Sequence, residues 1–168
     1  IIQFDEPSFN VFFDEVKDWG VAALERAAEG LRAETAVHIC YGYGITANND
    51  WKATLGSQWR QYEESFPLLQ RSSIDIVSLE CQHSHVPMDL IELIRGKKVM
   101  LGAIDVANDA VETPDEVADT LRRALAFVDA DKLIPSTNCG MAPFPREVAL
   151  QKLSALSAGA ALVRSELS

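Results

Sequence analysis

The feature that most constrains the fold is a fivefold alternation of short apolar segments with longer amphipathic ones. The short segments have the length and apolar, β-branched composition of buried strands; they are residues 1–5, 35–41, 74–80, 97–105 and 132–137. The segments that follow them are predicted to be helical; they are residues 13–31, 51–70, 87–96, 113–128 and 145–167. Strands that alternate with helices predict a parallel sheet with right-handed crossovers, and therefore an α/β fold.

Two of the predicted helices contain informative residues. Thr113, Pro114 and Glu116 combine a capping residue, a proline at the first helical position and an acid that reaches back to the cap. In the segment 51–70, Pro67 predicts a break in the helix.

Two architectures are compatible with this order of elements. One is an open doubly wound sheet, and the other is part of an eight-stranded (β/α)8 barrel, which five strands cannot close. No G-x-G-x-x-G motif follows the first strand, which weakens a dinucleotide-binding interpretation. Either architecture places the chemistry at the carboxyl ends of the strands. We see no low-complexity segment or linker, so residues 1–168 are expected to form a single domain.

Composition argues against several classes of partner. The 168 residues carry a formal net charge of −10, which suits neither a general nucleic-acid binder nor an anionic membrane surface. No apolar run reaches the roughly 18 residues of a membrane helix, and we see no signal peptide at the N-terminus. Three cysteines are too few for a disulfide framework. We therefore expect a cytoplasmic protein with reduced thiols.

Residues with metal-ligating or acid–base side chains occur where the predicted strands end. They are Asp5, Glu6, His38, Cys40, Glu80, Asp105, Asn138 and Cys139. His38 and Cys40 should point to the same side, because side chains alternate along an extended strand, and both can then bind one ion. A histidine, two cysteines and a glutamate suit Zn²⁺, which favours tetrahedral nitrogen, sulfur and oxygen ligands.

Each of these residues also has a simpler interpretation when it is taken alone. A single buried histidine or cysteine is more often part of the core than a ligand. Acids at the start of a helix, such as Asp5, Glu6 or Asp105, can act as ordinary caps. Cys81 is predicted to face away from the site because its neighbour Glu80 faces it. His83 and His85 are predicted to lie on a loop surface, although either can substitute as a ligand.

At this level of detail the chain resembles the catalytic C-terminal barrel of the cobalamin-independent methionine synthases. The resemblance is carried by IIQFDEPSF, HICY, SLE, GAIDV with VETPDEV, and NCGM, in the family's order and approximate spacing. It covers nearly the whole chain. It is strongest to the short homologues that lack the folate-binding N-terminal half.

This resemblance implies a (β/α)8 TIM-type barrel with a catalytic zinc, of which the chain holds about five C-terminal βα units. It implies zinc-dependent transfer of a methyl group to the thiol of homocysteine, which forms methionine. The implied zinc ligands are His38, Cys40, Glu80 and Cys139. The implied role of Asp5 is to hold the amino group of homocysteine. Glu6 and Asp105 are candidate catalytic residues on the side of the methyl donor. The run YGYG (41–44) is expected to form a loop whose two rings shield the site from water.

One departure from the family's pattern concerns the methyl donor. The long synthases carry a histidine two residues after the aspartate of the fourth strand, whereas this chain has Asp105, Val106 and Ala107. The departure puts direct use of a methyl-folate in doubt. It favours a methyl-corrinoid, or a folate delivered by a helper protein.

Two other functions stay open from the sequence. One is a corrinoid-dependent methyltransferase that acts on coenzyme M or another small thiol. The other is a zinc-stabilised domain without enzymatic activity.

Overall fold

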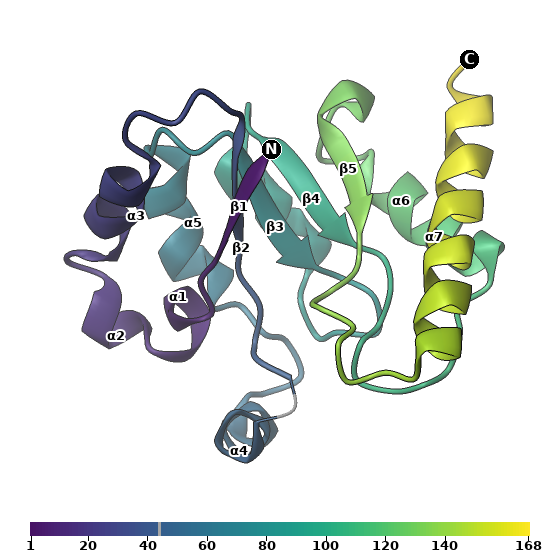
Figure 1. Ribbon diagram of the computed structural model, residues 1–168, viewed down its shortest axis with the longest axis horizontal. Coiled ribbons are helices and arrows are strands. Elements are labelled where there is room, and N and C mark those ends of the chain that lie inside the picture. The colour runs from purple at the N-terminus through teal and green to yellow at the C-terminus, as the bar shows by residue number, and fades with distance from the viewer. Residues whose placement is uncertain (44) are drawn as a thin grey trace.

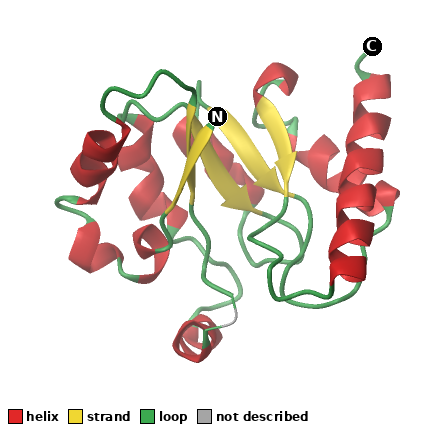
Figure 2. Cartoon of the chain, viewed as in Figure 1, coloured by secondary structure: helices red, strands yellow, loops and turns green. Residues whose placement is uncertain are grey.

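A sheet of five parallel strands forms the centre of the computed structural model, which describes residues 1–43 and 45–168. The strands are β1 (Ile2–Asp5), β2 (Thr35–His38), β3 (Ile76–Glu80), β4 (Lys98–Gly102) and β5 (Leu133–Ser136). They lie side by side in the order of the sequence (Figures 1 and 2). A doubly wound sheet reverses its strand order at a switch point, whereas a barrel adds strands in sequence. The fold is therefore a segment of a (β/α) barrel, as the resemblance implied.

Helices pack against the sheet, and one helix lies beyond the carboxyl ends of the strands. The α-helices are α1 (Ser8–Val11), α2 (Phe13–Val16), α3 (Gly20–Ala28), α4 (Thr46–Thr54), α5 (Tyr62–Gln70), α6 (Pro114–Ala124) and α7 (Arg146–Glu166). Two 3₁₀ helices, η1 (Met88–Ile94) and η2 (Ala130–Lys132), complete the set. In Figure 1, α4 lies below the ends towards which the strand arrows point. Within the described residues, none of the helices has the length and apolar character that crossing a membrane requires.

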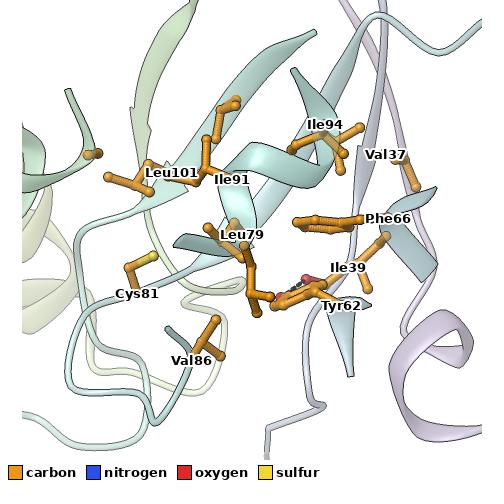
Figure 3. Close-up of a cluster of buried hydrophobic side chains, with 14 of the residues drawn as sticks. Val37, Ile39, Tyr62, Phe66, Leu79, Cys81, Val86, Ile91, Ile94 and Leu101 are labelled. Carbon is orange, nitrogen blue, oxygen red and sulfur yellow. Dashed lines mark hydrogen bonds between the residues drawn. The ribbon is translucent and has the colours of Figure 1, made fainter. Parts of the chain in front are cut away.

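The hydrophobic core lies between the helices and one face of the sheet. Alternate strand residues such as Val37, Leu79 and Leu101 pack there against helix residues such as Phe66 (Figure 3). Cys81 belongs to the same cluster, so the prediction that it faces away from the site is confirmed. Because side chains alternate, the intervening residues of each strand point to the opposite face. On that face lie three of the strand-end residues predicted to carry chemistry, Asp5, His38 and Glu80.

Several predicted helices differ from those observed. The segment 13–31 is not one helix: α2 and α3 are separated near Trp19, which has a non-helical backbone (φ −134°, ψ −19°). The segment 51–70 breaks after Leu55, which is extended (ψ 142°), and Pro67 lies inside α5. The break therefore falls next to Gly56, a poor helix former, and the prediction of a break near Pro67 was wrong. The capping box at Thr113 is confirmed.

Candidate active site

Three predicted ligands from two distant segments meet at the carboxyl ends of the strands. Ligand atoms of His38, Cys40 and Cys139 all lie within 4.8 Å of one another. The sulfur atoms of Cys40 and Cys139 are 3.5 Å apart, and neither cysteine forms a disulfide. Two sulfurs on one tetrahedral zinc, each at about 2.3 Å, lie about 3.8 Å apart. The two thiols are thus already near the separation that one such ion requires.

The nitrogen of the group is also suited to a ligand. His38 Nε2 is buried and has no hydrogen-bond partner within the described part of the chain. Buried polar atoms without a partner are rare, because losing water costs free energy that a new bond must replace. A metal ion is one partner that would satisfy this nitrogen, so the donor set fits Zn²⁺.

The two cysteines share one negative charge. The hydrogen bond with Cys40 and the neighbouring His38 together lower the pKa of Cys139 to about 4, against the opposing effect of burial. The hydrogen bond to Cys139, together with burial, raises the pKa of Cys40. Thiolates are the form of cysteine that binds metals. The pair therefore presents one thiolate at neutral pH and a second thiol that a cation could deprotonate.

Glu80 ends β3 beside this group, but within the described residues it is not one of the three that meet. Its side chain is almost fully buried, and its carboxylate accepts hydrogen bonds from the Tyr41 amide (3.0 Å) and the Tyr43 hydroxyl. Burial raises the pKa of Glu80 to about 7, against the lowering effect of these two bonds. The loop that follows β2 thus holds the carboxylate. After the hydrogen bond with Cys139 and burial, which have the largest effects, the charge of this carboxylate also raises the pKa of Cys40.

Lys52 of α4 holds that same loop. Its ammonium donates to the Gly42 carbonyl (2.8 Å) and lies 4.1 Å from the centre of the Tyr43 ring. The Tyr41 ring is fully buried in the core, and its hydroxyl donates to Gln61 (3.0 Å). Of the two rings predicted to shield the site, only that of Tyr43 therefore faces it. Gly44, the last residue of the predicted YGYG loop, lies outside the described residues. The contact of Tyr43 with Glu80 and that of Lys52 with the Tyr43 loop were not predicted, because no local pattern links the three positions.

Asp105 reaches the site from the loop after β4. Its carboxylate accepts the Ala107 amide (2.8 Å) and the Asn108 side chain (2.5 Å). Burial is the main cause that raises the pKa of Tyr43, followed by Glu80 and then by the charge of Asp105. His83 Nδ1 lies 3.7 Å from Asp105 Oδ2.

Both loop histidines are exposed, as predicted, and neither joins the ligand group formed by the described residues. His85 packs instead against the Trp59 ring, with centroids 5.2 Å apart. His83 has a positive φ of 50°, which is uncommon outside glycine.

The two acids after β1 are differently placed. Asp5 is the register partner of His38, so its side chain emerges on the face that carries the ligand group, and it is exposed. The Glu6 backbone amide donates a hydrogen bond to the His38 carbonyl (2.8 Å). Its carboxylate, however, accepts hydrogen bonds from the Ser8 amide (3.2 Å) and hydroxyl at the start of α1. The ordinary capping interpretation therefore describes what the Glu6 side chain does in this structure.

Asn138 connects the ends of three strands. The residue is buried, and its side-chain Oδ1 accepts hydrogen bonds from the backbone amides of Cys81 (3.2 Å) and Gln82 (3.3 Å). Its backbone amide donates to the Ile104 carbonyl (2.9 Å). Its side chain therefore bonds the loop after β3 and not the neighbouring Cys139. It fixes the position of Cys139 through the backbone.

Comparison with known proteins identifies the family. The family described as "Cobalamin-independent synthase, Catalytic domain" matches residues 1–161. The chain belongs to this family.

Curated methionine synthases are among its relatives. The chain is 31% identical over 169 residues to that of Saccharolobus islandicus (strain Y.G.57.14 / Yellowstone #1), which covers 99% of this chain and 45% of the relative. It is 29% identical over 168 residues to that of Sulfurisphaera tokodaii, covering 99% of this chain and 44% of the relative. The chain thus spans about half the length of the curated relatives it matches.

A solved structure from the same family is more similar. It is a B12-independent methionine synthase from Shewanella sp. W3-18-1 in complex with selenomethionine. It has 75% sequence identity and a TM-score of 0.94, covering 99% of this chain and 49% of that chain. The expected membership of the cobalamin-independent synthase family is therefore confirmed.

Proposed function

We propose that this chain carries the zinc-binding part of a methyltransferase that methylates the thiol of homocysteine to form methionine. The observation that carries the proposal is the meeting of His38, Cys40 and Cys139 within 4.8 Å at the carboxyl ends of the strands. Family membership and the similarity to methionine synthases support the choice of reaction.

The proposed resident metal is Zn²⁺, held by His38, Cys40 and Cys139, with Glu80 as the fourth ligand. Bound there, zinc would supply a Lewis acid that lowers the pKa of a substrate thiol. To join, the Glu80 carboxylate would exchange its hydrogen bond with the Tyr43 hydroxyl for the metal ion.

The chain's own acids would orient the two substrates. Asp5, which is exposed and is the register partner of His38, would pair with the ammonium group of homocysteine. That carboxylate favours an amino-acid thiol over coenzyme M, whose sulfonate it would repel. Asp105 would act on the side of the methyl donor, and Glu6 would act there only after its carboxylate leaves the Ser8 amide and hydroxyl.

The remaining partners follow from the same reaction. The methyl donor would be a methyl-corrinoid or a methyl-folate, delivered by a helper protein. We place the protein in the cytoplasm, because the site requires reduced thiols. We also propose that residues 1–168 form one continuous unit of a longer barrel.

Two variants and one matched control test the proposal. Purified protein, in its longest native form, is analysed for bound zinc and assayed with homocysteine and methylcobalamin or methyl-folate. We expect Cys40→Ser and Cys139→Ser to lose most of the zinc and the methylation activity. The control Cys81→Ser alters the buried cysteine that faces the core and should retain its zinc.

Two results would contradict the proposal. Full zinc occupancy in both ligand variants would refute the metal site. Zinc-loaded protein that methylates coenzyme M and not homocysteine would refute the substrate.

A further inference from the structure

A buried ion pair contacts Asp105 and lies outside the ligand group of His38, Cys40 and Cys139. Lys152 of α7 and Glu112 of the loop before α6 have side chains that are 0% and 2% exposed, and Lys152 Nζ lies 3.1 Å from Glu112 Oε2. The two residues are 40 positions apart in sequence. The sequence analysis assigned no role to either residue, although Glu112 belongs to the motif VETPDEV.

The pair binds both backbone polar groups of Asp105. Glu112 Oε1 accepts the Asp105 amide at 2.7 Å, and Lys152 Nζ donates to the Asp105 carbonyl at 3.0 Å. Lys152 Nζ also donates to the Ala110 carbonyl, which uses the third hydrogen of the ammonium group. Every hydrogen bond of this ammonium therefore goes to the loop that carries Asp105 or to Glu112.

The side chain of Asp105 is fixed from within the loop. Its two oxygens accept the Ala107 amide and the Asn108 side chain, at 2.8 and 2.5 Å. With the backbone held by the ion pair and the carboxylate held by the loop, the position and the direction of Asp105 are both determined.

Stability alone is a poor explanation for such a pair. Removing two charges from water costs several kcal/mol, and apolar residues of similar volume often stabilise a fold equally well. An ion pair offers what apolar residues do not, namely directional bonds to a backbone amide and a backbone carbonyl at once.

We propose that Lys152 and Glu112 are positioning residues that hold Asp105 in place for methyl transfer. The proposal rests on the proposed function, in which Asp105 acts on the side of the methyl donor. Misplacing a reacting group by about 1 Å can cost up to 10²-fold in rate, so a rigid support for Asp105 has a direct kinetic value.

The first test separates positioning from stability. Lys152→Met leaves Glu112 buried and unpaired, and we expect both the melting temperature and kcat to fall. Adding Glu112→Gln removes the second charge while it keeps an oxygen that can accept the Asp105 amide. We expect this double variant to regain most of the melting temperature but to keep a kcat about tenfold below wild type, with the KM for homocysteine within twofold. Recovery of kcat together with the melting temperature would overturn the proposal.

A matched control tests whether the loss of any salt bridge to α7 lowers kcat. Arg122 of α6 donates to Glu166 of α7 at 3.0 and 2.6 Å on the surface, away from the Asp105 loop. Arg122→Met should therefore leave kcat unchanged. A tenfold loss in this variant would overturn the proposal, because the effect would then come from α7 packing.

A double-mutant cycle with Asp105→Asn tests whether Lys152 acts through Asp105. If it does, Lys152→Met costs about tenfold in kcat in the wild-type background and less than twofold in the Asp105→Asn background. An equal loss in both backgrounds would overturn the proposal, and so would full activity of Asp105→Asn alone.

A measurement without turnover distinguishes failure of this inference from failure of the proposed function. Amide hydrogen exchange over residues 105–112 should accelerate in Lys152→Met and stay unchanged in Arg122→Met, with the zinc content of both at the wild-type level. Unchanged exchange in Lys152→Met would overturn the inference whatever the enzyme catalyses. Absence of homocysteine methylation by the wild-type protein would instead refute the proposed function.

Discussion

At the scale of single residues, the candidate site depends on groups whose charge is set by their neighbours. Cys139 is held as a thiolate by Cys40 and His38, whereas burial keeps a proton on Glu80 up to about neutral pH. At neutral pH the site therefore contains one thiolate, that of Cys139, and one carboxylate, that of Glu80, which is readily protonated. Shifts of this kind are typical of functional sites.

If Glu80 is the fourth ligand as proposed, Tyr43 competes with the metal ion for it, because the Tyr43 hydroxyl donates to the Glu80 carboxylate. Tyr43→Phe removes this bond, and we expect zinc affinity to rise about tenfold, the equivalent of about 1.4 kcal/mol. Competition with a chelator measures the affinity. Tyr41→Phe is the matched control, since its hydroxyl bonds Gln61 and not Glu80. Weaker zinc binding in Tyr43→Phe would mean that this tyrosine orients Glu80 as a ligand instead.

Glu80 should make the metal-free protein less stable as pH rises. Its pKa is about 7 in the folded chain and near 4.5 when unfolded, so the folded state binds the proton more tightly. The stabilisation is fully present below pH 4.5 and is lost as pH rises through about 7. We expect Glu80→Gln to remove this effect.

The measurement compares the two metal-free proteins in urea. Between pH 5 and 8, wild type should lose about 2 to 3 kcal/mol of unfolding free energy more than Glu80→Gln. Parallel pH profiles for the two proteins would show that Glu80 does not titrate in this range.

At the scale of elements, the meeting of His38, Cys40 and Cys139 depends on how closely the ends of β4 and β5 approach each other. A Cβ atom on Gly102 of β4 would lie 2.8 Å from the Asn138 Cα, which immediately precedes Cys139. Real Cβ atoms do not come so near a backbone atom, so only glycine fits at this position. The close approach lets Asn138 bond the loop after β3 and brings Cys139 to Cys40.

Gly102→Ala should therefore displace the segment that carries Cys139. We expect a loss of 1 to 3 kcal/mol in unfolding free energy, in the range of overpacked cores, and a clear drop in bound zinc. Gly140→Ala is the matched control, because a Cβ there meets no atom within 4 Å although it adjoins Cys139. Normal zinc content in Gly102→Ala would contradict this account.

At the scale of the whole molecule, the sheet has two edges that are open as far as the described residues extend. β1 pairs only with β2, and β5 only with β4. Ile1 and Ile2 are exposed at the first edge, and Leu150 and Leu153 of α7 are exposed beyond the second. Open edges with apolar residues favour pairing with further chain. This arrangement supports the proposal that additional βα units complete the barrel.

Residues 1–168 produced alone should self-associate. We expect light scattering with size-exclusion chromatography to show dimers or larger species at micromolar concentrations, and the longest native form of the protein to elute as a defined species. A stable monomer of residues 1–168 with the melting temperature of the longer protein would contradict a barrel completed by further units.

The sequence by itself determined the strands, their parallel order and the family, because apolar alternation and strand-end motifs are local signals. It also identified His38, Cys40 and Cys139, which adjoin strand ends that a parallel sheet must bring to one edge. The tertiary structure alone decided which of these residues meet, that Tyr43 bonds Glu80 while Lys52 holds the Tyr43 loop, and that Lys152 reaches Asp105 from a helix 47 residues away. Those contacts depend on side-chain direction and on the close approach of Gly102 to Asn138. Short-range periodicity does not encode these features, since they are set by packing between segments distant in sequence.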